Sequence, residues 1–337
     1  MEIALKYVLL LFLAVTIESA FDDDDFLLRF RFEDNPRLIR QFAIDISSSS
    51  SYVVSAQSNR ELEEAFVFNE TKSKTFKELG CFRARYDSKF SNFHGICEGI
   101  YGSDYIQIND QHRIKTTFGV CRKFDGNPTG GLNMLLIAGR IGLGPDAEKP
   151  GSTLRRDIMK TWEEPVLCLA TTNRRRVDER VISTGKNLAT PENTIVSTQI
   201  TPKTGFWQFP TIGFSIGTEV FSPISVVLST TTHYIKVPTK LFGKVIQAFS
   251  AFQENNSWYV HCDEEHPSLR LKIGGRMVEI LPGDLIEEVI PGKCRLLVNQ
   301  HNNDYMVVGA SVLYTNGVCL NYEMKTVTFY KPEMSRI

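Results

Sequence analysis

Short alternations of apolar and polar residues run through most of the chain. Residues 26–32 read F-L-L-R-F-R-F, and this alternation has the two-residue period of a β-strand. Similar runs rich in β-branched and aromatic residues, separated by Gly, Asn, Asp and Pro, occupy residues 105–108, 165–169, 269–273 and 326–330. The better helical candidates are residues 154–162 and 239–252. Many short strands and few helices predict an all-β fold.

Two segments of the chain share an unusual pattern. Residues 42–54 (F-A-I-D-I-S-S-S-S-S-Y-V-V) and 226–238 (V-V-L-S-T-T-T-H-Y-I-K-V-P) each begin with an apolar run that leads into a cluster of small hydroxyl residues. The first segment carries Asp45 where the second carries Ser229. Two further apolar runs, residues 140–144 and 307–311, contain a glycine at Gly142 and Gly309. These repeats predict a duplicated β protein with two similar lobes and a central cleft.

Composition and charge narrow the class of protein. The chain has 337 residues, of which 42% are hydrophobic and 23% charged, which is typical of a folded globular protein with room for two lobes. The formal net charge of −1 provides no overall electrostatic basis for binding nucleic acid or an anionic membrane. We therefore expect neither nucleic acid nor a membrane as a partner.

The N-terminus predicts secretion. Lys6 precedes the apolar run of residues 7–15, and the small residue Ala20 follows, so residues 1–20 have the pattern of a signal peptide. The apolar run is shorter than the roughly 20 residues that a membrane-spanning helix needs. Asn69 and Asn255 begin N-glycosylation sequons, which have meaning only in the secretory pathway. We expect a secreted, extracellular protein.

The chain contains seven cysteines, and secretion makes them candidates for disulfide bonds. An odd number leaves at least one cysteine free or bonded to another chain. We expect a monomer whose odd cysteine allows a disulfide-linked dimer.

With these patterns in place, residues from about 26 to 332 resemble the pepsin-like aspartic peptidases. The segments around Asp45 and Ser229 resemble the two D-T-G-[ST]-S elements of that family, and Gly142 and Gly309 match its two apolar-apolar-Gly strands. The Tyr101-Gly102 pair resembles the family's flap, and residues 205–208 (G-F-W-Q) resemble a strand early in its second lobe.

The resemblance implies a bilobal acid protease fold with two pseudo-symmetric, barrel-like lobes. The first would span residues 26–172 and the second residues 173–335. It also implies a disulfide between Cys262 and Cys294, and either a disulfide or a buried thiol pair formed by Cys168 and Cys319. Cys81, Cys97 and Cys121 all fall in the first lobe, and which two of them pair is left open.

The departures from the family pattern concern its chemistry. The family mechanism uses two carboxylates that share a proton and hold a water, so that one acts as acid and the other as base. Only Asp45 could fill such a role here, because Ser229 cannot exchange a proton at a useful pH. The motif glycines are also replaced, by Ser47 and Thr231, and we expect these side chains to move the two loops apart or to alter their turns.

Individual residues allow more than one interpretation. Asp45 is either a residual base or, as we favour, a structural carboxylate held by nearby hydroxyls. Tyr101 either closes over a ligand or packs its ring on the lobe. His261, Cys262 and His266 could suggest a metal site, but the implied disulfide of Cys262 argues against it, so we expect no metal and no cofactor.

The sequence therefore predicts a secreted pepsin-like homologue that is catalytically inactive and binds a peptide or protein in its cleft. One alternative is an aspartic endopeptidase with residual or unusual activity. A second is a structural component of an extracellular layer, linked through the odd cysteine.

Overall fold

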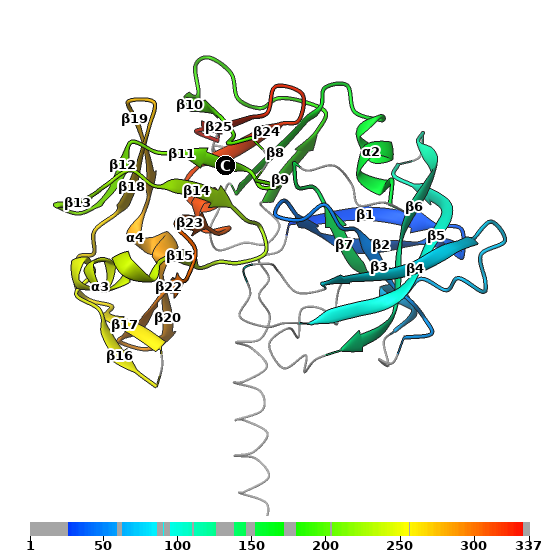
Figure 1. The fold of residues 1–337 in the computed structure, drawn as a ribbon, viewed down its shortest axis with the longest axis horizontal. Coiled ribbons are helices and arrows are strands. Elements are labelled where there is room, and N and C mark those ends of the chain that lie inside the picture. The colour runs from blue at the N-terminus through cyan, green and yellow to red at the C-terminus, as the bar shows by residue number, and fades with distance from the viewer. Residues whose placement is uncertain are drawn as a thin grey trace, which may run out of the picture.

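The computed structural model of the chain describes residues 26–58, 63–85, 90, 95–109, 111–125, 138–145, 152–171, 180–202, 204–255 and 257–332. The predicted signal peptide, residues 1–20, lies outside them. Strands predominate and the helices are short, arranged in two lobes (Figure 1). The prediction of an all-β, pepsin-like bilobal fold is confirmed.

Strands from the first part of the chain form one seven-stranded sheet. Its order is β1-β2-β7-β3-β6-β5-β4, and β1 also pairs with β5, so that the sheet curls back on itself. The strands are β1 (Leu27–Phe32), β2 (Asn35–Asp45), β3 (Tyr52–Val54), β4 (Lys77–Arg85), β5 (Ile96–Gln107), β6 (Arg113–Asp125) and β7 (Gly139–Gly142), with a 3-10 helix η1 (Glu64–Phe66).

Strands from the later part form three sheets, which Figure 1 shows as the other lobe. One has the order β11-β14-β23-β15-β22 and contains β11 (Gln208–Pro210), β14 (Ser225–Leu228), β15 (Ile235–Pro238), β22 (Val298–His301) and β23 (Tyr305–Val308). The second has the order β13-β12-β18-β19, from β12 (Gly213–Ile216), β13 (Glu219–Phe221), β18 (Leu269–Ile273) and β19 (Arg276–Ile280). The third has the order β16-β17-β21-β20, from β16 (Phe252–Glu254), β17 (Ser257–His261), β20 (Ile286–Ile290) and β21 (Lys293–Leu296). Three helices accompany them: α3 (Thr239–Ala248), α4 (Pro282–Leu285) and α5 (Val312–Thr315).

A fifth sheet brings distant parts of the chain together. Its order is β10-β25-β24-β8-β9, from β8 (Val166–Thr171), β9 (Arg180–Thr184), β10 (Thr194–Gln199), β24 (Gly317–Asn321) and β25 (Thr326–Tyr330). Helix α2 (Leu154–Met159) precedes β8. Because the C-terminal strands β24 and β25 lie between β8 and β10, the sheet ties the end of the chain to its middle (Figure 1).

The hydrophobic core continues between the two lobes. A single cluster of buried side chains runs from Phe26 to Phe329 and includes the fully buried Trp207. The indole N–H of Trp207 and the hydroxyl of Tyr322 both donate to the carbonyl of Leu143, at 3.3 and 2.7 Å. This shared acceptor connects the residue after β7 to the residues that flank β11 and β24. Burial raises the pKa of Tyr322.

Three disulfides stabilise the strands. Cys262 is bonded to Cys294, as the resemblance implied. Cys168 and Cys319 lie opposite each other in β8 and β24 and form a disulfide, which decides between the two alternatives left open by the resemblance. Cys97 and Cys121 join β5 to β6, which resolves the pairing left open by the sequence. Cys81, exposed on β4, is the free cysteine.

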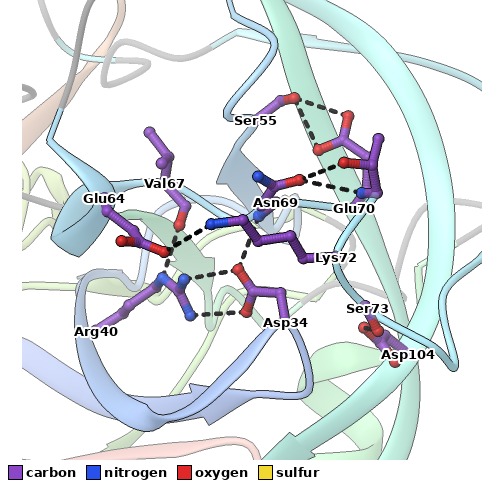
Figure 2. Close-up of polar contacts among 11 residues, drawn as sticks. Asp34, Arg40, Ser55, Glu64, Val67, Asn69, Glu70, Lys72, Ser73 and Asp104 are labelled. Atoms are coloured by element: carbon purple, nitrogen blue, oxygen red, sulfur yellow. Dashed lines mark hydrogen bonds and ion pairs between the residues drawn. The ribbon is translucent and has the colours of Figure 1, made fainter.

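A buried polar network anchors the start of the first sheet (Figure 2). Arg40, fully buried, makes a bidentate ion pair with Asp34 at 3.0 and 2.7 Å and donates through Nε to the carbonyl of Val67. The backbone N–H of Asn69 donates to the same carboxylate. The two buried charges of this network, Arg40 and Asp34, are thus paired, which is the condition under which such groups are tolerated in a core.

No helix in the described part of the chain is long and apolar enough to cross a membrane.

Candidate functional site

The first hydroxyl-rich segment begins where β2 ends at Asp45. There β2 runs parallel to β7, with Asp45 beside Gly142, and the N–H of Leu143 donates to the carbonyl of Asp45 at 2.7 Å. A side chain at Gly142 would collide with the backbone of Ser50. The close approach of these two segments therefore requires glycine at this position.

The second segment has the same construction. Strand β14 runs parallel to β23, and the N–H of Ser229 donates to the carbonyl of Val308 at 3.1 Å. A side chain at Gly309 would overlap the carbonyl of Thr232. Ser229 thus stands in the second segment where Asp45 stands in the first.

The two segments contact each other through Thr230. Its hydroxyl donates to the carbonyl of Ile44 at 2.6 Å and accepts from the N–H of Ile46 at 3.3 Å. The equivalent position in the first segment is Ile46, whose apolar side chain cannot return the interaction. The expected separation of the loops by Ser47 and Thr231 is not seen at this point of contact.

Asp45 is a buried carboxylate whose two oxygens face different neighbours. One oxygen accepts from the N–H and the hydroxyl of Ser47, at 2.8 and 2.6 Å. The other lies 3.6 Å from the guanidinium of Arg140, and the two side chains are 2% and 11% exposed. Ser47, in the place of the motif glycine, therefore contributes a hydroxyl that holds the carboxylate.

The second position offers only hydroxyl groups. The hydroxyl of Ser229 lies 3.1 Å from that of Thr231 and accepts from the N–H of Thr231 at 3.3 Å. A serine hydroxyl can donate a hydrogen bond but cannot store a proton near neutral pH. Among the described residues of the two segments, the arrangement therefore has one carboxylate, paired with Arg140, and hydroxyl groups at the second position.

Tyr101 is not at the tip of a hairpin. It lies within β5, paired with Gly80 on β4 and Gly119 on β6, and its ring packs edge-on against Phe82 with centroids 5.1 Å apart. The second interpretation, a ring packed on the lobe, describes this position. A two-residue Tyr-Gly match could not distinguish a strand interior from a turn, because both tolerate that pair.

The two sequon asparagines lie at turns. The side-chain oxygen of Asn69 accepts from both the N–H and the hydroxyl of Thr71, at 3.2 and 2.7 Å (Figure 2 includes Asn69). Asn255 is exposed, with a left-handed φ of 48° between β16 and β17. Glycosylation of either residue stays a prediction.

Sequence reasoning gave no role to two residues of the site, Arg140 and Thr230. Arg140 could have been noticed because it is the one charged residue in the apolar run of residues 135–144. Charged residues are rarely placed on a buried strand without a partner. Thr230 had a weaker signal, the mismatch with Ile46 at the same place in the two segments.

Two comparisons with known proteins bear on this site. A family model described as Eukaryotic aspartyl protease matches residues 39–331, a range that contains both segments. No curated protein matches the chain.

Proposed function

Since this chain belongs to the eukaryotic aspartyl protease family, with residues 39–331 matched, we propose that it is a non-catalytic member that binds a peptide or protein between its lobes. The observation that carries the first half of this proposal is the ion pair between Asp45 and Arg140. This carboxylate is oriented by Ser47 and faces a cation in Arg140. With Ser229 at the equivalent position of the second segment, there is no second carboxylate to share a proton with Asp45.

The binding role is supported by what the chain retains. The two segments, their glycine-bearing strands and the bridge from Thr230 to Ile44 are all kept without the chemistry. Stability of the fold does not by itself require two loops to meet at the junction of the lobes, here taken as residues 26–172 and 173–335. Extended chain segments are the expected ligands, because strand edges bind them through main-chain hydrogen bonds.

Secretion is part of the proposal. Six cysteines are paired in three disulfides, and such bonds persist in oxidising, extracellular compartments. Residues 1–20, which have the pattern of a signal peptide, would direct the chain into the secretory pathway.

The test is cleavage of an unbiased peptide library by the secreted protein, from acid to neutral pH, with Asp45→Ala as the matched control. We expect the two proteins to give the same background, because loss of each acid–base group costs about 100- to 10,000-fold. Cleavage by the natural protein that disappears in Asp45→Ala would overturn the non-catalytic assignment and establish an endopeptidase. Binding is scored with the same library, by retention on the immobilised protein.

A further inference from the structure

Phe252 is a large aromatic side chain exposed at the edge of a sheet. It lies on β16, the outermost strand of the sheet β16-β17-β21-β20 at the periphery of the later lobe, and is 37% exposed (Figure 1). It pairs with Tyr259 on β17, and its ring centroid lies 6.2 Å from that of Tyr259 and 5.2 Å from that of His261. The ring of Phe252 is inclined by only 32° and 34° to these two rings. We call the three rings the aromatic strip.

Two charged side chains border the aromatic strip. The ammonium of Lys293 lies 4.3 Å from the centre of the Tyr259 ring and 2.6 Å from the carboxylate of Glu254. Glu254 is two residues from Phe252 on β16, so both side chains point to the same face of the hairpin. The surface therefore combines aromatic faces, which attract the C–H groups of a sugar ring, with a donor and an acceptor for its polar groups.

A glycosylation sequon lies at the end of the same hairpin. Residues 255–257 read N-N-S, and Asn255 is exposed in the connection between β16 and β17, with a left-handed φ of 48°. Asparagine is common in that conformation, so the turn alone accounts for Asn255. The turn requires neither an exposed aromatic ring three residues earlier nor the serine at position 257.

The spacing of these residues suits a sugar chain that folds back on the strand. Three residues of a strand, the separation of Phe252 and Asn255, span about 10 Å, and the first two N-acetylglucosamine units of an N-linked glycan extend over a comparable distance. We propose that the aromatic strip is the surface on which the N-linked glycan of Asn255 lies, so that the glycan stabilises this hairpin. The inference assigns a contact to the predicted modification and does not depend on any ligand of the cleft.

The contact also has a consequence for the edge of the sheet. An outermost strand with an exposed apolar side chain is a place where chains associate. A glycan held against Phe252 covers this edge, whereas a glycan that extends freely into solvent leaves the ring uncovered.

A first measurement establishes occupancy and tests stability. The full chain is made in a eukaryotic secretory host, and mass spectrometry of the peptide that contains Asn255 should find it glycosylated. Ser257→Ala removes the sequon but keeps Asn255 in the turn, and we expect it to raise the equilibrium constant of unfolding about threefold, the size of one cross-strand aromatic pair. The same substitution should have no effect in a Phe252→Ala background, where the ring is missing.

Two controls isolate the contact. Val220→Ala truncates another exposed apolar side chain, on the edge strand β13, and should leave the effect of Ser257→Ala intact. In protein made in the bacterial periplasm, which attaches no N-linked glycan, Ser257→Ala should be neutral. An unmodified Asn255, an effect of equal size with and without Phe252, or the same effect in the bacterial protein would each overturn the inference.

A second measurement detects the contact without reference to stability. The protein is produced with isotope-labelled N-acetylglucosamine, and the acetyl methyl signals of the Asn255 glycan are identified by their loss in Ser257→Ala. We expect the ring of Phe252 to shift at least one of these signals upfield, and Phe252→Ala to return it to the position seen in the unfolded glycoprotein. Signals at the same position in the natural protein and in Phe252→Ala would show that the glycan does not lie on the aromatic strip.

Discussion

At the scale of single residues, the pair formed by Arg140 and Asp45 has energetic as well as chemical consequences. Both side chains are nearly excluded from solvent. Removing one partner of a buried pair leaves an uncompensated charge, which costs more than the pair itself contributes. Arg140→Met should therefore lower the free energy of unfolding by about 3 kcal/mol, as measured by urea denaturation.

A double-mutant cycle separates this effect from lost packing. Asp45→Asn combined with Arg140→Met should recover part of the loss, because the uncompensated charge is then gone. Lys240→Met, at the exposed ion pair with Asp304, should leave unfolding unchanged. Equal losses of unfolding free energy in Arg140→Met and in the double variant would show that the ion pair does not stabilise the fold.

Lys236 should make stability depend on pH. Burial lowers the pKa of Lys236 in the folded protein. At pH values between its folded and its unfolded pKa, the unfolded chain therefore holds the proton while the folded protein has released it. Stability therefore rises with pH through that window, since the unfolded state holds more protons there. We expect the natural protein to gain stability relative to Lys236→Met as the pH is raised through that window, measured by denaturation over a pH series. Parallel pH profiles for the two proteins would show that the ammonium is solvated.

At the scale of elements, the contact between the two hydroxyl-rich segments depends on one side chain. Thr230→Val keeps the shape of the side chain but leaves the carbonyl of Ile44 and the N–H of Ile46 without this partner. Unsatisfied buried groups of this kind cost about 2 kcal/mol, and we expect that loss on thermal or chemical unfolding. Thr328→Val removes an exposed hydroxyl bonded to Ser197 and should change stability little. Equal effects of the two substitutions would show that the bridge does not join the segments.

The cysteines give a second prediction at this scale. Three disulfides account for six of the seven cysteines, and Cys81 is exposed on β4, at the edge of the first sheet. A maleimide should therefore label one thiol per native chain without reduction, and mass spectrometry should find it on Cys81. Cys81→Ser should accept no label and should also remove any dimer that reducing agent dissolves. A label on Cys97 or Cys121 would contradict the disulfide between these two residues.

At the scale of the whole molecule, repeated local patterns were predictable and contacts between distant residues were not. The strand alternations, the duplicated segments and the two glycines at close approaches follow from side-chain period and backbone sterics. Cys97–Cys121 could not be chosen over pairs with Cys81, because the choice depends on strand register. Arg140 beside Asp45 and Phe90 against Lys236 could not be predicted, because tertiary packing brings them together. The second pair is separated by 146 residues.

Under the proposed function, recovery of catalysis requires changes in both segments of the molecule. Ser229→Asp with Thr231→Gly restores a second carboxylate, but Arg140 would still hold Asp45 in an ion pair. In a pair of carboxylates, mutual repulsion separates the two pKa values, and a cation beside the pair works against that separation. We therefore expect background cleavage from the double variant, and cleavage at acid pH at least about 100-fold above it once Arg140→Leu is added. Asp45→Ala in the triple variant should abolish the gain. Full activity in the double variant would show that the missing carboxylate alone, and not Arg140, accounts for the proposed lack of activity.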